Sequence, residues 1–158
     1  MSMTTETTLD LDIKQRLLEE CLRQQTDFVD NARRAMEEAQ TSANESQSAI
    51  EDKFESFREA CQIQRDMFAK QLDEAQAKLS ILKRIVRNKV NEEVALGSIV
   101  RTDAQNYFIS VSLGEIVIDG EKFYAISAAS PVFQVMAGKT KGETFLFRDK
   151  KITILDIC

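Results

Sequence analysis

Histidine and tryptophan are both missing from this chain of 158 residues. Without histidine, a Ser-His-Asp triad and the ordinary zinc sites built on imidazole are excluded. The three cysteines, Cys21, Cys61 and Cys158, are odd in number and far apart, and no C-x-x-C pair occurs. This spacing supports neither a zinc ribbon nor a redox pair, and reduced thiols are typical of a cytoplasmic protein.

Glycine and proline are missing from the first 96 residues, because all five glycines and Pro131 lie beyond them. These residues interrupt regular helices and mark turns, so their distribution predicts a boundary between two kinds of structure. We expect a flexible N-terminus over residues 1–9, a helical hairpin over residues 10–90 and a sheet domain over residues 96–158.

Apolar residues in the first half recur at steps of four and three, which is the pattern of a narrow coiled-coil stripe. The first stripe contains Leu18, Leu22, Val29, Ala32, Met36, Ala39 and Ala43. The second stripe contains Phe54, Phe57, Cys61, Phe68, Ala75, Leu79, Leu82 and Val86. Two such stripes predict an antiparallel coiled-coil hairpin in a monomer, although the same stripes could also pair between two chains.

Capping signals place the turn between these helices within residues 44–55. Asn44 is expected to end the first helix in a left-handed conformation. Ser48 and Glu51 match the S-x-x-E capping box that begins a helix, so the second helix is expected to start there.

Negative charge is concentrated at this turn. Between Glu37 and Glu59 lie seven acidic and two basic residues, a local net charge of −5 that equals the net charge of the whole chain. Asp52 and Glu55 fall on one helix face, three residues apart. Acidic residues early in a helix also gain about 0.3–1 kcal/mol from the helix dipole, so a purely structural role is the alternative.

The remaining residues carry no net charge, and this limits the partners of the chain. Without a basic field, direct sequence-specific binding of nucleic acid is not expected. No apolar run is long enough to span a membrane, and the polar N-terminus is unlike a secretory signal. We therefore expect a cytoplasmic protein that does not contact membranes.

The second half is rich in β-branched and aromatic residues separated by turn signals. The expected strands are GSIVR, NYFISVSL, EIVI, KFYAIS, TFLF and KITILDI. Asp119-Gly120 and Arg148-Asp149 are the expected hairpin turns. The alternation within NYFISVSL predicts a strand with one buried face in an antiparallel sheet.

One short helix is expected between these strands, in SPVFQVMAGK. Ser130 is placed as its N-cap, Pro131 as its first residue and Gly138 as its stop. The fold class is therefore α+β, with an N-terminal helical hairpin and a C-terminal sheet domain that carries one short helix.

The C-terminal stretch ISAASPVFQVMAGKTKGETF, followed by KKITILDI, resembles the signature of the Gre-type transcription elongation factors. The matching positions are Ile126, Ser127, Ser130, Pro131, Gly138, Lys139, Gly142 and Glu143. The segment Gly97-Ser98-Ile99-Val100 also matches the first strand of that family. The resemblance implies an N-terminal antiparallel coiled coil followed by an FKBP-like domain.

In Gre-type factors the C-terminal domain docks on RNA polymerase, and the hairpin enters the secondary channel of the enzyme. Two acidic residues at the tip help the polymerase to hold a second Mg²⁺ ion, and the polymerase then hydrolyses backtracked RNA. The resemblance assigns this catalytic and metal-holding role to Asp52 and Glu55, with Ser56 where the family has asparagine. Mg²⁺ is therefore expected only in complex with the polymerase, to which the chain is an accessory factor.

The resemblance assigns polymerase docking to Ser130, Pro131, Gly138 and Lys139 at the ends of the short helix. It also leads us to expect that residues 96–158 fold alone and supply much of the affinity for polymerase. Three alternatives stay open: a channel-binding regulator that does not promote cleavage, a coiled-coil scaffold protein, and a prolyl isomerase of the FKBP type.

Overall fold

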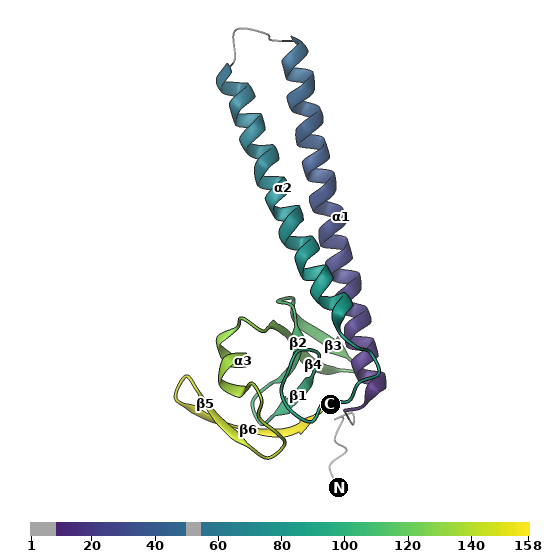
Figure 1. The fold of residues 1–158 in the computed structure, drawn as a ribbon, viewed down its shortest axis with the longest axis vertical. Helices are drawn as coiled ribbons and strands as arrows, with labels where there is room; N and C mark the ends of the chain where they lie inside the picture. Colours follow the sequence, from purple (N-terminus) through teal and green to yellow (C-terminus); the bar gives the residue numbers. More distant parts are fainter. Residues whose placement is uncertain (1–8, 50–54) are drawn as a thin grey trace. The chain divides into compact units, whose positions relative to one another are not determined.

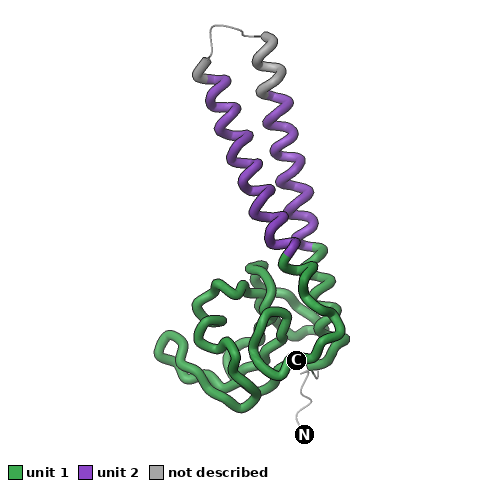
Figure 2. The backbone as a smooth tube through the Cα atoms, in the orientation of Figure 1, with its two compact units in different colours: residues 1–23, 81–158 green, residues 24–80 purple. Residues whose placement is uncertain are grey.

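The computed structural model describes residues 9–49 and 55–158, with side chains over residues 9–42 and 57–158. Its elements are α1 (Leu11–Ala49), α2 (Glu55–Arg84), β1 (Ile99–Thr102), β2 (Asn106–Ser110), β3 (Gly114–Ile118), β4 (Glu121–Ser127), α3 (Pro131–Met136), β5 (Thr144–Phe147) and β6 (Lys150–Ile157) (Figure 1). They form two compact units, one of residues 1–23 with 81–158 and one of residues 24–80 (Figure 2). No helix in the described part of the chain is both long and apolar enough to cross a membrane.

The unit of residues 24–80 is an antiparallel helical hairpin, as the coiled-coil stripes predict. Gln25 of α1 donates its side-chain amide to the carbonyl of Ala75 in α2, at 2.8 Å. Closer to the turn, Arg65 of α2 donates to Gln40 of α1 at 3.0 Å. Early residues of α1 thus lie beside late residues of α2, which confirms a hairpin within one chain.

The predicted ends of the hairpin helices are wrong. α1 continues through Asn44 and Ser48 to Ala49, so neither residue caps a helix where the sequence suggested. Asn44 alone is a weak stop signal, because the residues around it carry no glycine or proline to break the helix. At the other end α2 stops at Arg84, and Val86 is 55 % exposed although the stripe placed it in the seam.

The C-terminal residues form a six-stranded sheet in the order β3-β4-β2-β1-β6-β5. All six predicted strand segments contribute a strand, and the two predicted hairpin turns join β3 to β4 and β5 to β6. The sheet is mixed, however, since β2 and β4 run parallel, with Tyr107 beside Tyr124. After β2 the chain passes to the edge of the sheet, where it forms β3. It then turns back as β4, which lies between β3 and β2, antiparallel to β3 and parallel to β2.

One face of the sheet packs against the first turns of α1 and the last turn of α2. Phe108 and Phe123 are fully buried there, together with Leu17 and Leu82 from the two helices. α1 begins at this site because the Asp10 side chain accepts a hydrogen bond from the Ile13 amide at 3.0 Å, which caps the helix. The roots of the hairpin helices are therefore part of the sheet unit.

The other face of the sheet packs against α3. Tyr107 and Ile109 of β2 lie in this second core with Val132 and Met136 of α3. The prediction of a single buried face for this strand is therefore wrong, because Phe108 is buried on the first face. An alternating pattern identifies one apolar face but does not exclude burial of the other.

Ser110 is a weak point of the first core. Its hydroxyl is enclosed without a hydrogen-bond partner among the described residues. The Cys21 thiol lies close to it; burial raises the pKa of this thiol, and the contact with Ser110 opposes part of that rise, but sulfur is a weak hydrogen-bond partner. An enclosed hydroxyl that makes no normal hydrogen bond carries the cost of its lost hydration.

Ser110→Ala should therefore leave the free energy of unfolding unchanged or raise it by up to about 1 kcal/mol. Ser98→Ala is the matched control, because Ser98 is equally buried but donates to the Ala95 carbonyl at 2.7 Å and accepts from the Ala95 amide at 3.1 Å. This control should cost about 1–3 kcal/mol. Urea unfolding measures the free energy of unfolding of both variants. An equal loss of stability in Ser110→Ala and Ser98→Ala would contradict the prediction.

Candidate functional site

The docking residues suggested by the sequence gather around α3. Ser130 is the N-cap, since its hydroxyl accepts from the Phe133 amide at 3.4 Å and donates to the Ser127 carbonyl at 2.8 Å. Pro131 is the exposed first residue of the helix, where a missing amide hydrogen costs nothing. The predicted beginning of this helix is confirmed.

The end of α3 is held by the segment that follows α2. Gly138 has a φ of 76°, the left-handed conformation expected of the residue after a helix. Its amide donates to the Val94 carbonyl at 2.8 Å, and the Val94 amide donates to the Lys139 carbonyl at 2.9 Å. An isolated bridge between Glu93 and Thr140 continues this pairing. The backbone of this motif therefore positions the turn, while the Pro131 side chain is exposed and that of Lys139 is half-buried.

A buried lysine fixes the path of the segment that reaches Val94. Lys14 of α1 donates from its ammonium group to the Lys89 carbonyl at 2.6 Å and to the Asn91 side chain at 3.0 Å. The side chain is fully buried, and burial lowers the pKa of the ammonium group below its ordinary value. These two hydrogen bonds offset part of the cost of enclosing a charge.

The acidic tip falls largely outside the described residues. Asp52 lies outside them, and Glu55 is the first residue of α2 with its side chain outside them. The proposed Mg²⁺-holding pair therefore stays a prediction from the sequence. Elsewhere in the described part of the chain, no group of three or more Cys, Asp or Glu side chains could hold a metal ion.

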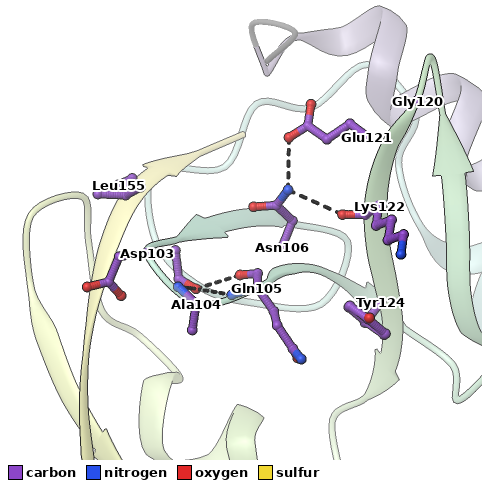
Figure 3. Close-up of a pocket in the computed structure, with 10 residues that line it drawn as sticks. Asp103, Ala104, Gln105, Asn106, Gly120, Glu121, Lys122, Tyr124 and Leu155 are labelled. Carbon is purple, nitrogen blue, oxygen red and sulfur yellow. Dashed lines mark hydrogen bonds between the residues drawn. The ribbon is translucent and has the colours of Figure 1, made fainter. Parts of the chain in front are cut away.

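A buried ion pair is the polar feature that the sequence did not predict. Arg101 of β1 and Glu121 of β4 approach to 2.7 Å, with side chains only 9 % and 8 % exposed. Asn106 of β2, which is opposite Arg101 in the strand pairing, donates to Glu121 at 2.8 Å and to the Lys122 carbonyl at 3.2 Å (Figure 3). The acidic partner is 20 residues from the arginine along the chain, so only the pairing of the strands brings the two together.

An open hollow of about 700 Å³ lies beside this ion pair. Its lining is mostly polar, and Tyr124 is the one aromatic residue that lines it (Figure 3). Both carboxylates in its lining accept hydrogen bonds, Glu121 from Arg101 and Asn106, and Asp103 from the Thr153 amide at 2.9 Å. A polar wall with a single aromatic ring is a poor match to the apolar pockets that bind small ligands, and it gives no support to a prolyl-isomerase site.

The cysteines of the sheet unit are not nucleophiles. Burial raises the pKa of the Cys21 thiol to about 12, so this group stays protonated near neutral pH. Burial also raises the pKa of the Cys158 thiol, and both side chains are enclosed. Neither thiol has the lowered pKa and the access that a reactive cysteine needs.

The Arg101–Glu121 pair gives a direct test of the sheet. Glu121→Gln should lower the free energy of unfolding by about 3 kcal/mol, because it leaves a buried guanidinium without its counter-charge. Asp119→Asn is the control: Asp119 pairs with Arg16 at the surface, the side chains being 52 % and 40 % exposed, so its loss should change stability much less. Denaturant unfolding gives the free energy of unfolding of the two variants. An equal loss in both would show that the buried Arg101–Glu121 pair stabilises the fold no more than the surface pair does.

Comparisons with known proteins identify no family for this chain. No family model matches it, and no curated protein matches it. Among solved structures, the transcription factor Gfh1 is 19 % identical with a TM-score of 0.36, covering 86 % of this chain and 92 % of its own. GreA factor homolog 1 of Thermus thermophilus is 16 % identical with a TM-score of 0.37, covering 87 % and 94 %. At these identities and TM-scores, the likeness does not establish that this chain belongs to their family.

Proposed function

We propose that this chain is a transcription elongation factor that binds RNA polymerase and inserts its helical hairpin into the secondary channel. The observation that carries the proposal is the hairpin of residues 24–80, which packs as a compact unit of its own. Its turn region holds the entire net negative charge of the chain. A narrow two-helix hairpin with an acidic turn suits delivery of carboxylates through a pore.

A second line of support comes from the α3 region. The Gre-like signature residues Ser130 and Gly138 begin and end the short helix there, Ser130 as its N-cap and Gly138 with a positive φ after its last turn. Pro131 and Lys139 then offer their side chains at the two ends of the same short helix. In this proposal they form the docking contact with the polymerase.

The acidic tip acts in this proposal only within the polymerase. Mg²⁺ takes six oxygen ligands and keeps several waters, so two exposed carboxylates bind it poorly alone. Beside the polymerase carboxylates and an RNA phosphate, Asp52 and Glu55 complete a metal site. The chemistry that such a two-metal site would supply is stabilisation of the attacking and leaving oxygens during hydrolysis of the backtracked RNA.

A non-cleaving regulator is the second candidate, and Ser56 is the observation that favours it. Serine stands there in place of the asparagine of the family's D-x-x-E-N tip. In this version the chain occupies the channel and modulates synthesis without supplying metal ligands.

Transcript cleavage on a stalled complex of the cognate polymerase separates these roles. Asp52→Asn combined with Glu55→Gln should reduce Mg²⁺-dependent cleavage by roughly 10- to 100-fold, because metal ligands lose their charge. The free energy of unfolding should change by about 1 kcal/mol or less, since the two substitutions remove charge and keep the shape of the side chains. Glu45→Gln is the matched control, and it should leave most of the cleavage intact.

Binding must be measured in the same preparations. Lys139→Glu should weaken polymerase binding and leave cleavage at saturation unchanged, because the backbone of Lys139, not its side chain, pairs with Val94. A wild-type chain that binds without promoting cleavage would support the regulator, and cleavage that survives the double change would remove Asp52 and Glu55 from the mechanism. A wild-type chain that captures no polymerase would contradict the whole proposal and favour a scaffold protein.

A further inference from the structure

Two polar side chains interrupt the buried face of α1, and each donates to the backbone of a distant segment. Lys14 stands four residues before Leu18 on one helix face, and both side chains are fully enclosed. Gln25 follows on the same face and is also buried. Lys14 donates to the Lys89 carbonyl, 75 residues along the chain. Gln25 donates to the Ala75 carbonyl, 50 residues along the chain.

A lysine at such a position is costly to the fold. Burying an ammonium group opposes folding even when oxygen atoms accept its hydrogen bonds. A methionine or leucine would fill the same space without that cost. The lysine supplies instead two directed hydrogen bonds, at 2.6 Å to the Lys89 carbonyl and at 3.0 Å to the Asn91 side chain. Its position therefore indicates a role in holding residues 89–91 and not in filling the core.

The segment that Lys14 holds, residues 85–98, connects α2 to β1 and contains no helix or strand. Its path therefore depends on single contacts and not on a regular ladder of hydrogen bonds. The two ends of the segment meet in the first core, where a methyl group added at Gly97 would lie 3.1 Å from the buried Ile85 side chain. Between these ends, the contacts of Lys14 and of Val94 position the segment.

Val94 connects this segment to the turn after α3. The Val94 carbonyl accepts from the Gly138 amide at 2.8 Å, and the Val94 amide donates to the Lys139 carbonyl at 2.9 Å. Val94 is three residues beyond Asn91, which is about 10 Å of extended chain. A displacement of the backbone at Asn91 therefore reaches the turn directly.

We propose that Lys14 is a positioning residue for the turn after α3: its ammonium group holds residues 89–91, and these hold Val94 against Gly138 and Lys139. Lys14 acts only through the backbone, because its side chain is enclosed and cannot touch a partner. A partner that fixes the turn also fixes residues 89–91 against α1, so the two ends of this path stabilise each other. Docking of the turn on RNA polymerase is the one step that rests on the proposed function.

Amide hydrogen exchange of the full chain, followed by NMR, tests the positioning. Lys14→Met removes the donor and keeps an apolar stem, so exchange protection at Val94 and Gly138 should fall roughly 10- to 100-fold. The Gly142 amide donates to the Ile154 carbonyl at 2.8 Å on the other side of the turn and should keep its protection. The urea midpoint should change little, because the charge is no longer buried and this offsets the lost hydrogen bonds.

Lys89→Met is the matched control, because the Lys89 side chain is exposed and the substitution keeps the carbonyl acceptor. It should leave the protection of Val94 and Gly138 unchanged. Asn91→Leu removes one of the two acceptors and should lower the same protection by a smaller factor. This variant decides the point where Lys14→Met does not fold.

The proposal is overturned if Lys14→Met leaves Val94 and Gly138 as protected as in the wild-type chain, or if Lys89→Met exposes them equally. It is also overturned if Gly142 loses protection to the same extent, because Lys14 then stabilises the whole unit and not the turn.

Binding to RNA polymerase separates this proposal from the proposed function. Lys14 and Asn91 are both enclosed, so a loss of affinity in Lys14→Met or Asn91→Leu reports the position of the turn. Both variants should bind more weakly than the wild-type chain, by the factor by which the native turn is depopulated. Equal affinities would overturn the link to docking. A wild-type chain that captures no polymerase would contradict the proposed function alone, and hydrogen exchange would still decide whether Lys14 positions the turn.

Discussion

The sheet of this protein is apolar on both faces, and each face must therefore be covered. The α1 and α2 roots cover one face through Leu17 and Leu82, and α3 covers the other through Met136. Truncating a fully buried leucine typically costs about 2–5 kcal/mol, which is a large part of the stability of a small domain. The first turns of α1 and the last turn of α2 are therefore part of the sheet core.

This constraint also positions the candidate docking turn. The path of the segment after α2 is fixed, because Ile85 is buried in the core and the Lys14 ammonium group donates a hydrogen bond to the Lys89 carbonyl. The segment then exchanges two backbone hydrogen bonds with the end of α3 through Val94. The end of α3 is thus connected to the root of the hairpin by paired backbone, and the residues of the Gre-like motif lie at that connection.

Local patterns predicted much of the fold. The coiled-coil stripes predicted the hairpin, and turn signals such as Asp119-Gly120 predicted the correct strands, because each pattern reflects a conformation of a few neighbouring residues. The helix end at Asn44 was wrong, since helix continuation competes with a weak cap. The parallel pairing of β2 with β4 depends on chain topology, which no single strand reveals.

The candidate site was predictable only where its residues are close in the sequence. Ser130 and Gly138 belong to one short motif, and their capping roles follow from residue type. The Arg101–Glu121 pair and the hydrogen bonds of Lys14 join residues far apart in the sequence, so they could be identified only from the fold. The roles of Asp52 and Glu55 stay predictions, because the described side chains do not include them.

The central claim is that the sheet needs the roots of α1 and α2 to cover one of its faces. The unfolding of two shortened chains tests this claim most directly. The resemblance led us to expect that residues 96–158 fold alone, but this fragment lacks every helical side chain of the first core, including Leu17, Leu18 and Leu82, so we now expect that it does not. A second chain joins residues 9–23 to residues 81–158 through a flexible linker and restores them. On heating or in urea, the second chain should show a cooperative unfolding transition, and the first chain should show none. A cooperative transition of similar midpoint in residues 96–158 alone would show that the sheet does not depend on the helix roots, and would contradict the account.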